Sequence, residues 1–371
     1  MNRKKPEPIF VTKPSMPAIE DYRLLLEDIW SSGYLTNNGP MVKKLENELS
    51  KAMKIQDFVA INNGTSAIQA AIKALNLKGE IITTPFTWIA TVSAIKAEGC
   101  EPVFCDIDPE TLNIDPKEIE ASITEKTVAI LPVHVFGNPC DAVAIEKIAE
   151  RHNLKVIYDA AHAMGTTLNN QSVLRYGDIS ATSLHATKLF STVEGGGCIS
   201  DNEAIMSRIR RIRNFGLKDQ YKINEDGFNG KMSEVHAAFG LANLPNLANI
   251  LHDRKEKYHH YLNHLGSVEN LKFQKLNGDG CNYSYFPLMF EEESTLHEVL
   301  DALKCHEIFP RRYFYPALTE SVELPSTKPM LIAEDIARRI LCLPLYHQLS
   351  FQNIDFICGL ICSTVEHRKA S

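Results

Sequence analysis

Lys188 lies in a stretch where covalent chemistry is feasible. Residues 182–190 are rich in small and hydroxyl side chains, and three consecutive glycines follow shortly after them. The flanking residues, 179–183 and 197–200, are predicted to form short strands. An amine held in a partly dry pocket has its charged form disfavoured, so its pKa falls and it can attack a carbonyl to form a Schiff base.

An acid that could work with this lysine follows another predicted strand. The apolar run at residues 155–159 ends in Asp159, and His162 comes three residues later. Ligands collect at the carboxyl ends of strands in a parallel sheet. A carboxylate there could keep a proton on the ring nitrogen of a bound cofactor. An aspartate in this position could also cap a helix, bind a metal or accept a phosphoryl group.

A candidate anion site precedes a predicted helix near the start of the chain. Residues 62–67 form a turn that contains Gly64, Thr65 and Ser66, and a helical apolar pattern begins at Ile68. Free backbone N–H groups at a helix start, together with two hydroxyls, suit a phosphate dianion. The plainer interpretation of the turn alone is a helix N-cap.

The combination of lysine, acid and anion cradle favours one cofactor. Pyridoxal phosphate is the commonest carbonyl partner of such a lysine, and it requires an acid at its pyridine nitrogen and hydrogen-bond donors around its phosphate. Each group alone is weak support. We therefore interpret Lys188 and Asp159 as catalytic, with Gly64, Thr65 and Ser66 at the phosphate.

The elements that must position these residues alternate between strand and helix. This alternation predicts an α/β fold with a mostly parallel sheet that is covered by helices on both faces. Helices at 18–32, 41–53, 89–98, 116–122 and 141–152 accompany strands at 58–61, 80–84, 102–106, 127–133 and 156–159. The basic segment 205–215 is interpreted as a solvated helix face, although one of its arginines could meet a carboxylate or a diphosphate.

The C-terminal part is predicted to be a smaller α+β unit. Helices at 235–244 and 250–265 lead into it, so we divide the chain into a large domain, residues 1–248, and a small domain, residues 249–371. The small domain is expected to contain strands at 283–290 and 312–315 and helices at 294–305, 332–340 and 353–363.

Composition excludes several other functions. A net charge of −7 argues against nucleic acid as a partner. No run approaches the ~18 apolar residues that a membrane helix needs, and residues 1–6 are basic without an apolar segment behind them. Nine cysteines without paired spacing indicate reduced thiols and a cytoplasmic location. Cys358 and Cys362 lack a second pair, so we expect core packing and no metal site.

Several motifs, taken in order, resemble the DegT/DnrJ/EryC1/StrS family of pyridoxal-phosphate-dependent sugar aminotransferases. The similarity covers nearly the whole chain, and the motifs that carry it lie at residues 32–40, 63–67, 84–91, 159–163, 183–196, 213–216, 227–233 and 343–346. The resemblance implies the type I aminotransferase fold. It also implies a cofactor that alternates between pyridoxal and pyridoxamine phosphate while L-glutamate becomes 2-oxoglutarate.

The resemblance also implies roles for individual residues. Trp88 would stack on the pyridine ring, although a lone tryptophan could also fill a core. Ser183 would help to bind the cofactor. Asn229 matches an asparagine that reaches the phosphate of the neighbouring subunit, which implies a homodimer with shared active sites. His162 stands where glutamine is usual and would still hydrogen-bond the ring hydroxyl, and Lys231 stands where arginine is usual.

The substrate implied by the resemblance is a nucleotide-linked keto-sugar. His185, Glu194 and the run at 187–194 are most similar to members that aminate C4 of 4-keto-6-deoxyhexoses, such as those that form dTDP-4-amino-4,6-dideoxyglucose for surface polysaccharides, the O-antigen of lipopolysaccharide among them. Glu194 and Tyr315 are further candidates for sugar contacts. Leu184 and Val193 depart from the usual phenylalanine and glycine, which leaves fine substrate preference open.

Other functions are kept as alternatives. Amination at C3 within the same family remains open, as does a cofactor-binding regulator without turnover. A pyridoxamine-dependent sugar dehydratase would carry histidine in place of Lys188. A Rossmann oxidoreductase would fit the alternating elements, but the sequence has no Gly-x-Gly-x-x-Gly after its first strand.

Overall fold

The large sheet of the protein has seven strands. The computed structural model describes residues 7–219, 221–321 and 328–369. In spatial order the strands are β2 (Phe58–Ile61), β10 (Gly196–Ile199), β9 (Ile179–Ser183), β6 (Lys155–Asp159), β5 (Thr127–Ile130), β3 (Glu80–Thr83) and β4 (Glu101–Phe104). Only β10 in this sheet is antiparallel to its neighbours. The predicted mostly parallel sheet is therefore confirmed.

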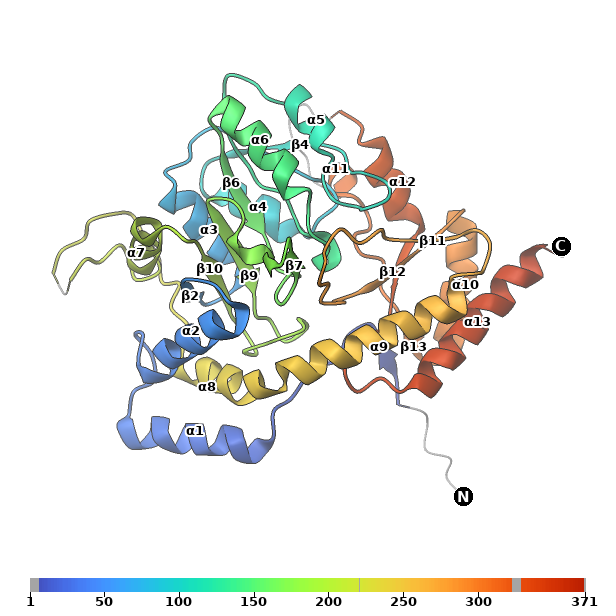
Figure 1. Cartoon of the computed structure of the whole chain (residues 1–371), viewed down its shortest axis with the longest axis horizontal. Coiled ribbons are helices and arrows are strands. Elements are labelled where there is room, and N and C mark those ends of the chain that lie inside the picture. Colours follow the sequence, from blue (N-terminus) through green and yellow to red (C-terminus); the bar gives the residue numbers. More distant parts are fainter. Residues whose placement is uncertain (1–6, 220, 322–327, 370–371) are drawn as a thin grey trace.

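Helices cover both faces of this sheet (Figure 1). They are α2 (Pro40–Met53), α3 (Gly64–Ala74), α4 (Ile89–Ala97), α5 (Pro116–Ala121), α6 (Ala142–His152) and α7 (Glu203–Ile212). Beyond them, α8 (Glu234–Asn243) packs against α2, and α1 (Ile19–Ser32) packs against α8. Alternate strand residues face opposite layers. Ile157 of β6 packs with α3, α4 and α7, whereas Tyr158 packs with α5 and α6.

The helix ends follow local sequence signals. Gly33 ends α1 in the left-handed conformation with φ 65°, and its N–H donates to the carbonyl of Ile29. Pro40 occupies the first turn of α2, where its missing N–H costs nothing. Asp141 and Ser233 cap α6 and α8 through their side-chain oxygens.

The C-terminal part contains a separate antiparallel sheet of β11 (Leu271–Phe273), β12 (Phe286–Phe290) and β14 (Ile340–Leu343). Its helices are α9 (Leu247–Leu265), α10 (Glu293–Cys305), α11 (Leu318–Ser321), α12 (Leu331–Arg339) and α13 (Phe351–Lys369). The long α9 connects the two parts and lies beside α13 (Figure 1). The proposed division at residues 248 and 249 falls in the first turn of α9 and stays a prediction.

One prediction for the C-terminal part was wrong, and one strand there was not predicted. Residues 312–315 form no strand, because Tyr313 and Phe314 pack against Tyr285 and Phe136 in a turn. Aromatic side chains favour strands in isolation, and here tertiary packing outweighed that preference. The helix expected at 332–340 ends at Arg339, and the fully buried β14, which was not predicted, begins at the next residue.

The first residues that the structure describes contact the C-terminal part. β1 (Ile9–Phe10) pairs in parallel with β13 (Ile308–Phe309). The short strands β7 (Thr167–Leu168) and β8 (Gln171–Ser172) form a separate hairpin. The basic start of the chain, residues 1–6, lies outside the described residues.

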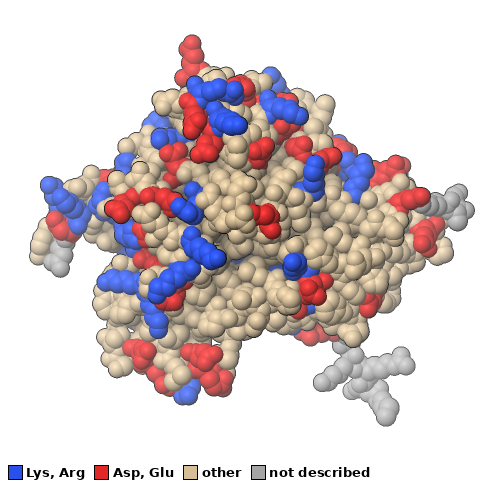
Figure 2. Space-filling model, in the orientation of Figure 1, with Lys and Arg blue, Asp and Glu red and all other residues tan. Residues whose placement is uncertain are grey.

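The surface carries charges of both signs. Figure 2 shows acidic and basic side chains interspersed around a central uncharged area on this face. All nine cysteines are free thiols, and Cys358 packs in the C-terminal core. Within the described ranges, every helix is too short or too polar to cross a lipid bilayer.

Candidate active site

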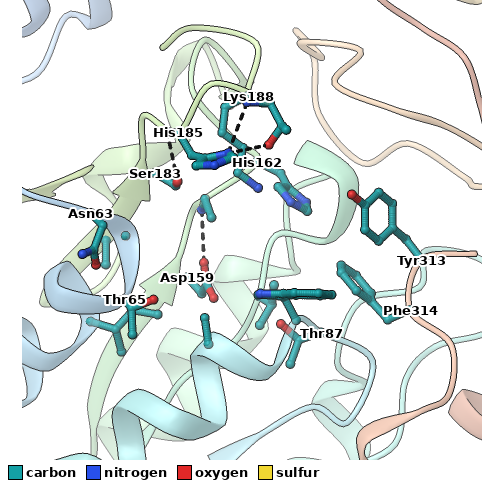
Figure 3. Close-up of a pocket in the computed structure, with 18 of the residues that line it drawn as sticks. Asn63, Thr65, Thr87, Asp159, His162, Ser183, His185, Lys188, Tyr313 and Phe314 are labelled. Carbon is teal, nitrogen blue, oxygen red and sulfur yellow. Dashed lines mark hydrogen bonds between the residues drawn. The ribbon is translucent and has the colours of Figure 1, made fainter. Parts of the chain in front are cut away.

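A cavity of about 380 Å³ opens at the carboxyl edge of the large sheet (Figure 3). Strands β2, β6, β9 and β3 all run in the same direction, so the segments that follow them meet at this edge. The cavity is lined from these segments by Asn63, Gly64, Thr65, Thr87, Trp88, Asp159, His162, Ser183, His185, Lys188 and Glu194. Most of the residues singled out from the sequence therefore come together.

Lys188 is held in a turn after β9, where its backbone N–H donates to the carbonyl of His185 at 2.8 Å. Burial lowers the pKa of the Lys188 ammonium from 10.5 to about 8, because the charged form loses hydration, and the Asp159 carboxylate partly opposes this shift. In the described part of the chain, no hydrogen bond engages its amine. An amine with such a pKa can act as a nucleophile or as a base at pH values close to neutral.

Asp159 ends β6 and is only 6% exposed. Its Oδ2 accepts a hydrogen bond from Thr91 Oγ1 at 2.7 Å, and its Oδ1 accepts one from the Ala161 N–H at 3.1 Å. Burial raises the pKa of this carboxyl, whereas the two hydrogen bonds and the Lys188 charge lower it. The two hydrogen bonds stabilise the Asp159 carboxylate only in part, and a cation bound beside it would neutralise its charge.

His162 lies in the cavity wall with aromatic rings around it. Its ring is nearly parallel to those of Phe136 and Phe314, at centroid distances of 6.4 and 6.2 Å. Burial, reinforced by the Lys188 charge, holds the pKa of His162 well below 6.5, so the imidazole is neutral. Its Nδ1 is buried without a hydrogen-bond partner. Such an orphaned polar atom at a cavity indicates a missing ligand.

The anion cradle forms where α3 begins. The Asn63 side chain caps the helix by accepting from the Ser66 N–H at 2.8 Å. A Cβ added at Gly64 would lie 2.9 Å from the Ser183 Cβ, so the backbone must approach β9 closely here. Thr65 and Ser183 line the cavity, whereas Ser66 does not.

The mouth of the cavity carries both polar and charged groups. His185 Nδ1 lies 2.8 Å from Thr187 Oγ1, and its Nε2 lies 3.5 Å from Glu194 Oε1. On the opposite wall, the Arg311 guanidinium lies 5.8 Å from the ring of Trp88 and 4.9 Å from that of Tyr313. No carboxylate in the described residues forms an ion pair with Arg311. Both contacts are cation–π interactions.

Besides Ser66, two of the candidate residues lie outside the cavity. Tyr315 is 45% exposed and stacks under Arg312, whose guanidinium carbon lies 3.5 Å from the ring centroid. Asn229 is exposed in the loop that leads to α8, and its carbonyl accepts a weak hydrogen bond from Asn62 Nδ2 at 3.4 Å. Both roles stay predictions.

Four site residues were not anticipated as such: Asn63, Thr91, Arg311 and Tyr313. Asn63 could have been found, because asparagine is a preferred N-cap and stood directly before the Gly64 turn. The segment 309–316 also gave a signal, since it combines aromatic and basic residues. Nothing in the sequence placed it beside strands more than 100 residues earlier.

The residues present fit pyridoxal phosphate. Lys188 could bond its aldehyde carbon, and Asp159 could pair with its pyridine nitrogen. The unpartnered His162 Nδ1 could meet its ring hydroxyl, and the N–H groups of the Gly64 turn could bind its phosphate. The exposed ring of Trp88 in the cavity wall could cover the cofactor ring.

Comparisons with known proteins agree with this chemistry. The DegT/DnrJ/EryC1/StrS aminotransferase family matches residues 18–361. The chain is 44% identical over 361 residues to a dTDP-4-amino-4,6-dideoxy-D-glucose transaminase of Shigella dysenteriae, covering 96% of this chain and 98% of that relative.

Solved structures lead to the same family. DesI, determined with its TDP-sugar product, matches with a TM-score of 0.92 and 30% identity over 98% of this chain and 94% of its own. NtdA of Bacillus subtilis with bound cofactor PMP matches with a TM-score of 0.87 and 26% identity, over 94% and 82%. Because these similarities extend through every segment that lines the cavity, the chain belongs to the DegT/DnrJ/EryC1/StrS aminotransferase family.

Proposed function

We propose that the protein is a pyridoxal-phosphate-dependent aminotransferase that transfers the amino group of L-glutamate to C4 of dTDP-4-keto-6-deoxyglucose. One observation carries the chemistry: Lys188, with its lowered pKa, shares a buried cavity with Asp159. The relatives support the acceptor, because the Shigella dysenteriae protein and one from Escherichia coli at 38% identity are both named dTDP-4-amino-4,6-dideoxy-D-glucose transaminases.

The cofactor would supply an electron sink that takes up the charge left when a proton departs from the donor's Cα. Asp159 would strengthen that sink by keeping a proton on the ring nitrogen. The protonated nitrogen would be the cation that pairs with the Asp159 carboxylate. His162 and the Gly64 turn would orient the ring from its two ends. Phe136 and Phe314, which pack against the His162 ring, belong to one buried apolar cluster.

Lys188 would carry the protons. With a pKa of about 8, about one tenth of the amine is free at pH 7 and can remove the Cα proton of glutamate. The protonated amine would pass that proton to the cofactor carbon within the same half-reaction, and in the second half-reaction Lys188 would carry a proton the opposite way, to C4 of the keto-sugar. A single acid–base group serving two substrates in turn implies ping-pong kinetics, with 2-oxoglutarate leaving before the sugar binds.

Arg311 is the residue we assign to substrate anions. Both substrates are anionic, since glutamate carries carboxylates and the sugar carries a diphosphate. Arg311 has no carboxylate partner in the described residues and contacts Trp88 at the cavity wall. His185 and Glu194 are proposed to contact the sugar, and Tyr315 is retained as a more distant candidate.

A homodimer is proposed as the working assembly. Large apolar side chains are exposed on and next to α1, including Ile19, Leu24 and Trp30, which are 66, 55 and 75% exposed. Exposed apolar surface of this extent is typical of an interface. Asn229 lies outside the cavity of its own chain and is free to serve a neighbouring one. We place the reaction in the cytoplasm, where glutamate and nucleotide sugars are made.

The test is an absorption experiment on purified protein supplied with pyridoxal phosphate. The visible band of the bound cofactor should disappear when L-glutamate is added and return when dTDP-4-keto-6-deoxyglucose follows. NMR of the product should place the nitrogen at C4 and thereby exclude amination at C3.

Each other outcome contradicts a defined part of the proposal. A band that disappears but returns only with a GDP-linked keto-sugar would overturn the acceptor. A band that glutamate leaves unchanged would favour a regulator without turnover. Absence of any band would overturn the assignment of the cofactor itself.

A further inference from the structure

Three metal-ligating side chains meet on the C-terminal part, away from the catalytic cavity. His260 and His264 lie on α9, and Asp355 lies on α13. One ligand atom from each falls within 4.8 Å of the other two, and in the described part of the chain no other such group of three exists. None of the three lines the catalytic cavity.

The spacing of the two histidines explains why they meet. Residues four apart on a helix lie on the same face, and the ring centroids of His260 and His264 are 4.7 Å apart. The ring of Phe351, in the first turn of α13, packs edge-on against His260 at 4.9 Å and fixes its orientation. The pair is therefore presented toward the neighbouring helix.

Asp355 completes the group with a single oxygen. Its Oδ1 lies 2.6 Å from His260 Nε2 and 3.2 Å from His264 Nε2. Ligand atoms of a four-coordinate zinc ion lie about 3.3 Å apart when each is ~2.0–2.1 Å from the metal. The second distance already matches this value, and the first would have to open by well under 1 Å.

We propose that His260, His264 and Asp355 form a binding site for a divalent transition-metal ion of the zinc class, which links α9 to α13. Two imidazoles and one carboxylate are a ligand set that suits zinc, and a fourth position would go to water. Water can reach that position, because the three side chains are 28, 44 and 50% exposed. An ion there joins the connecting helix to the last helix of the chain.

The competing explanation is a hydrogen-bonded triad in which Asp355 accepts from both imidazoles. The two explanations differ in what the protein does when a metal is added. The cofactor-loaded protein without a histidine tag should be titrated with Zn²⁺ by calorimetry and with Co²⁺ by visible spectroscopy. All proteins should carry Cys305→Ser, because Cys305 is an exposed free thiol that could bind metal independently.

Binding of one Zn²⁺ per chain is expected, together with the d–d absorption of a four-coordinate Co²⁺ and a raised Tm. His264→Ala and Asp355→Asn should each weaken binding by more than ~100-fold, since the loss of a direct ligand exceeds the 10–100-fold effect of changing a residue that only orients a ligand. His264 is the better choice for substitution, because His260 also packs on Phe351.

The matched control is His252→Ala, which removes an exposed histidine from the same helix. It should bind both metals as the parent does, and transaminase activity should be unchanged in all variants. The proposal is overturned if the parent binds no metal, or if His264→Ala and Asp355→Asn bind it as tightly as the parent.

Discussion

Two regions of the molecule bury charged groups, and they differ in how completely those groups are paired. Arg213 and Glu46 form an ion pair whose side chains are only 4 and 10% exposed. Arg213 Nη1 donates to Glu46 at 2.5 Å and to the carbonyl of Ala60 at 2.6 Å, and its Nη2 donates to Asn38 at 2.8 Å. In this pair, opposite charge and hydrogen bonds together offset the cost of burial.

The catalytic cavity leaves its groups incompletely paired. His162 Nδ1 has no hydrogen-bond partner, and in the described residues no acceptor engages the Lys188 amine. The pKa of Lys188 is lowered, whereas Arg213 keeps a carboxylate in contact. We call a buried charged or polar group saturated when hydrogen bonds or an opposite charge pair it, and unsaturated when they do not. Saturated groups stabilise the fold, whereas unsaturated groups remain available to a ligand. The following predictions test this distinction.

The largest effect should follow loss of the unsaturated lysine. Lys188→Ala should reduce turnover by ~10⁴-fold or more, because both the covalent link and the proton carrier disappear. Tm should be maintained, since no hydrogen bond of the amine is lost. Lys188→Arg is the matched control, because it keeps the charge yet cannot lose its proton. Substantial activity in either variant, measured by coupled assay of 2-oxoglutarate, would refute the assigned role.

Breaking the saturated pair should affect stability and leave chemistry intact. Glu46→Gln leaves the Arg213 charge buried without its counter-charge, and we expect a loss of ~3–5 kcal/mol in the free energy of unfolding. Denaturant titration measures this loss. The control is Glu27→Gln, which removes the partner of Arg23 at a site where both side chains are more than half exposed. That change should cost at most ~1 kcal/mol. If Glu46→Gln and Glu27→Gln lost equal free energy of unfolding, the buried ion pair would contribute no more than an exposed one, which would contradict this prediction.

The pH dependence of Lys188 should reveal its unsaturated state directly. In cofactor-free protein, acetylation of Lys188 followed by mass spectrometry should be half-maximal near pH 8. Exposed lysines should react only nearer their ordinary pKa of about 10.4. Asp159→Asn should move the Lys188 midpoint to lower pH, because the carboxylate now raises that pKa. A midpoint that stayed near pH 10 would show a solvated amine.

The pKa of Lys188 also determines how this residue changes the free energy of unfolding with pH. The folded-state pKa of Lys188 lies below the unfolded one, so the unfolded chain binds more protons between about pH 8 and 10.5. The contribution of Lys188 to the free energy of unfolding therefore rises with pH across that window. The burial penalty of the ammonium is present in full below pH 8.

The smallest effect is expected at His162. His162→Gln should change kcat by no more than ~10-fold, because an amide can replace the imidazole as a hydrogen-bond partner worth ~0.5–1.5 kcal/mol. His162→Leu is the matched variant that fills similar space and cannot hydrogen-bond, so it should lose more activity and shift the cofactor absorption. If Gln and Leu behaved alike, the unpartnered nitrogen would have no part in binding.

The sequence predicted those parts of the site that depend on local pattern. Lys188, Asp159 and Gly64 each follow a strand, so their shared sheet edge could be deduced from alternation alone. Arg311 and Tyr313 reach the cavity from the C-terminal part, and only tertiary packing brings them there. The same packing explains the missing strand at 312–315. The strand β14 was missed because four buried apolar residues directly after a helix have no periodicity that distinguishes strand from helix.

The pairing of β1 with β13 bears on how the chain is made. A ribosome releases Ile9 and Phe10 long before Ile308 and Phe309, so the first strand has no partner while most of the chain is synthesised. Phe10 stacks on Phe309 with 5.4 Å between ring centroids, and this apolar contact can form only after Phe309 has been synthesised. A chain whose synthesis stalled before Phe309 would therefore carry β1 without its partner strand.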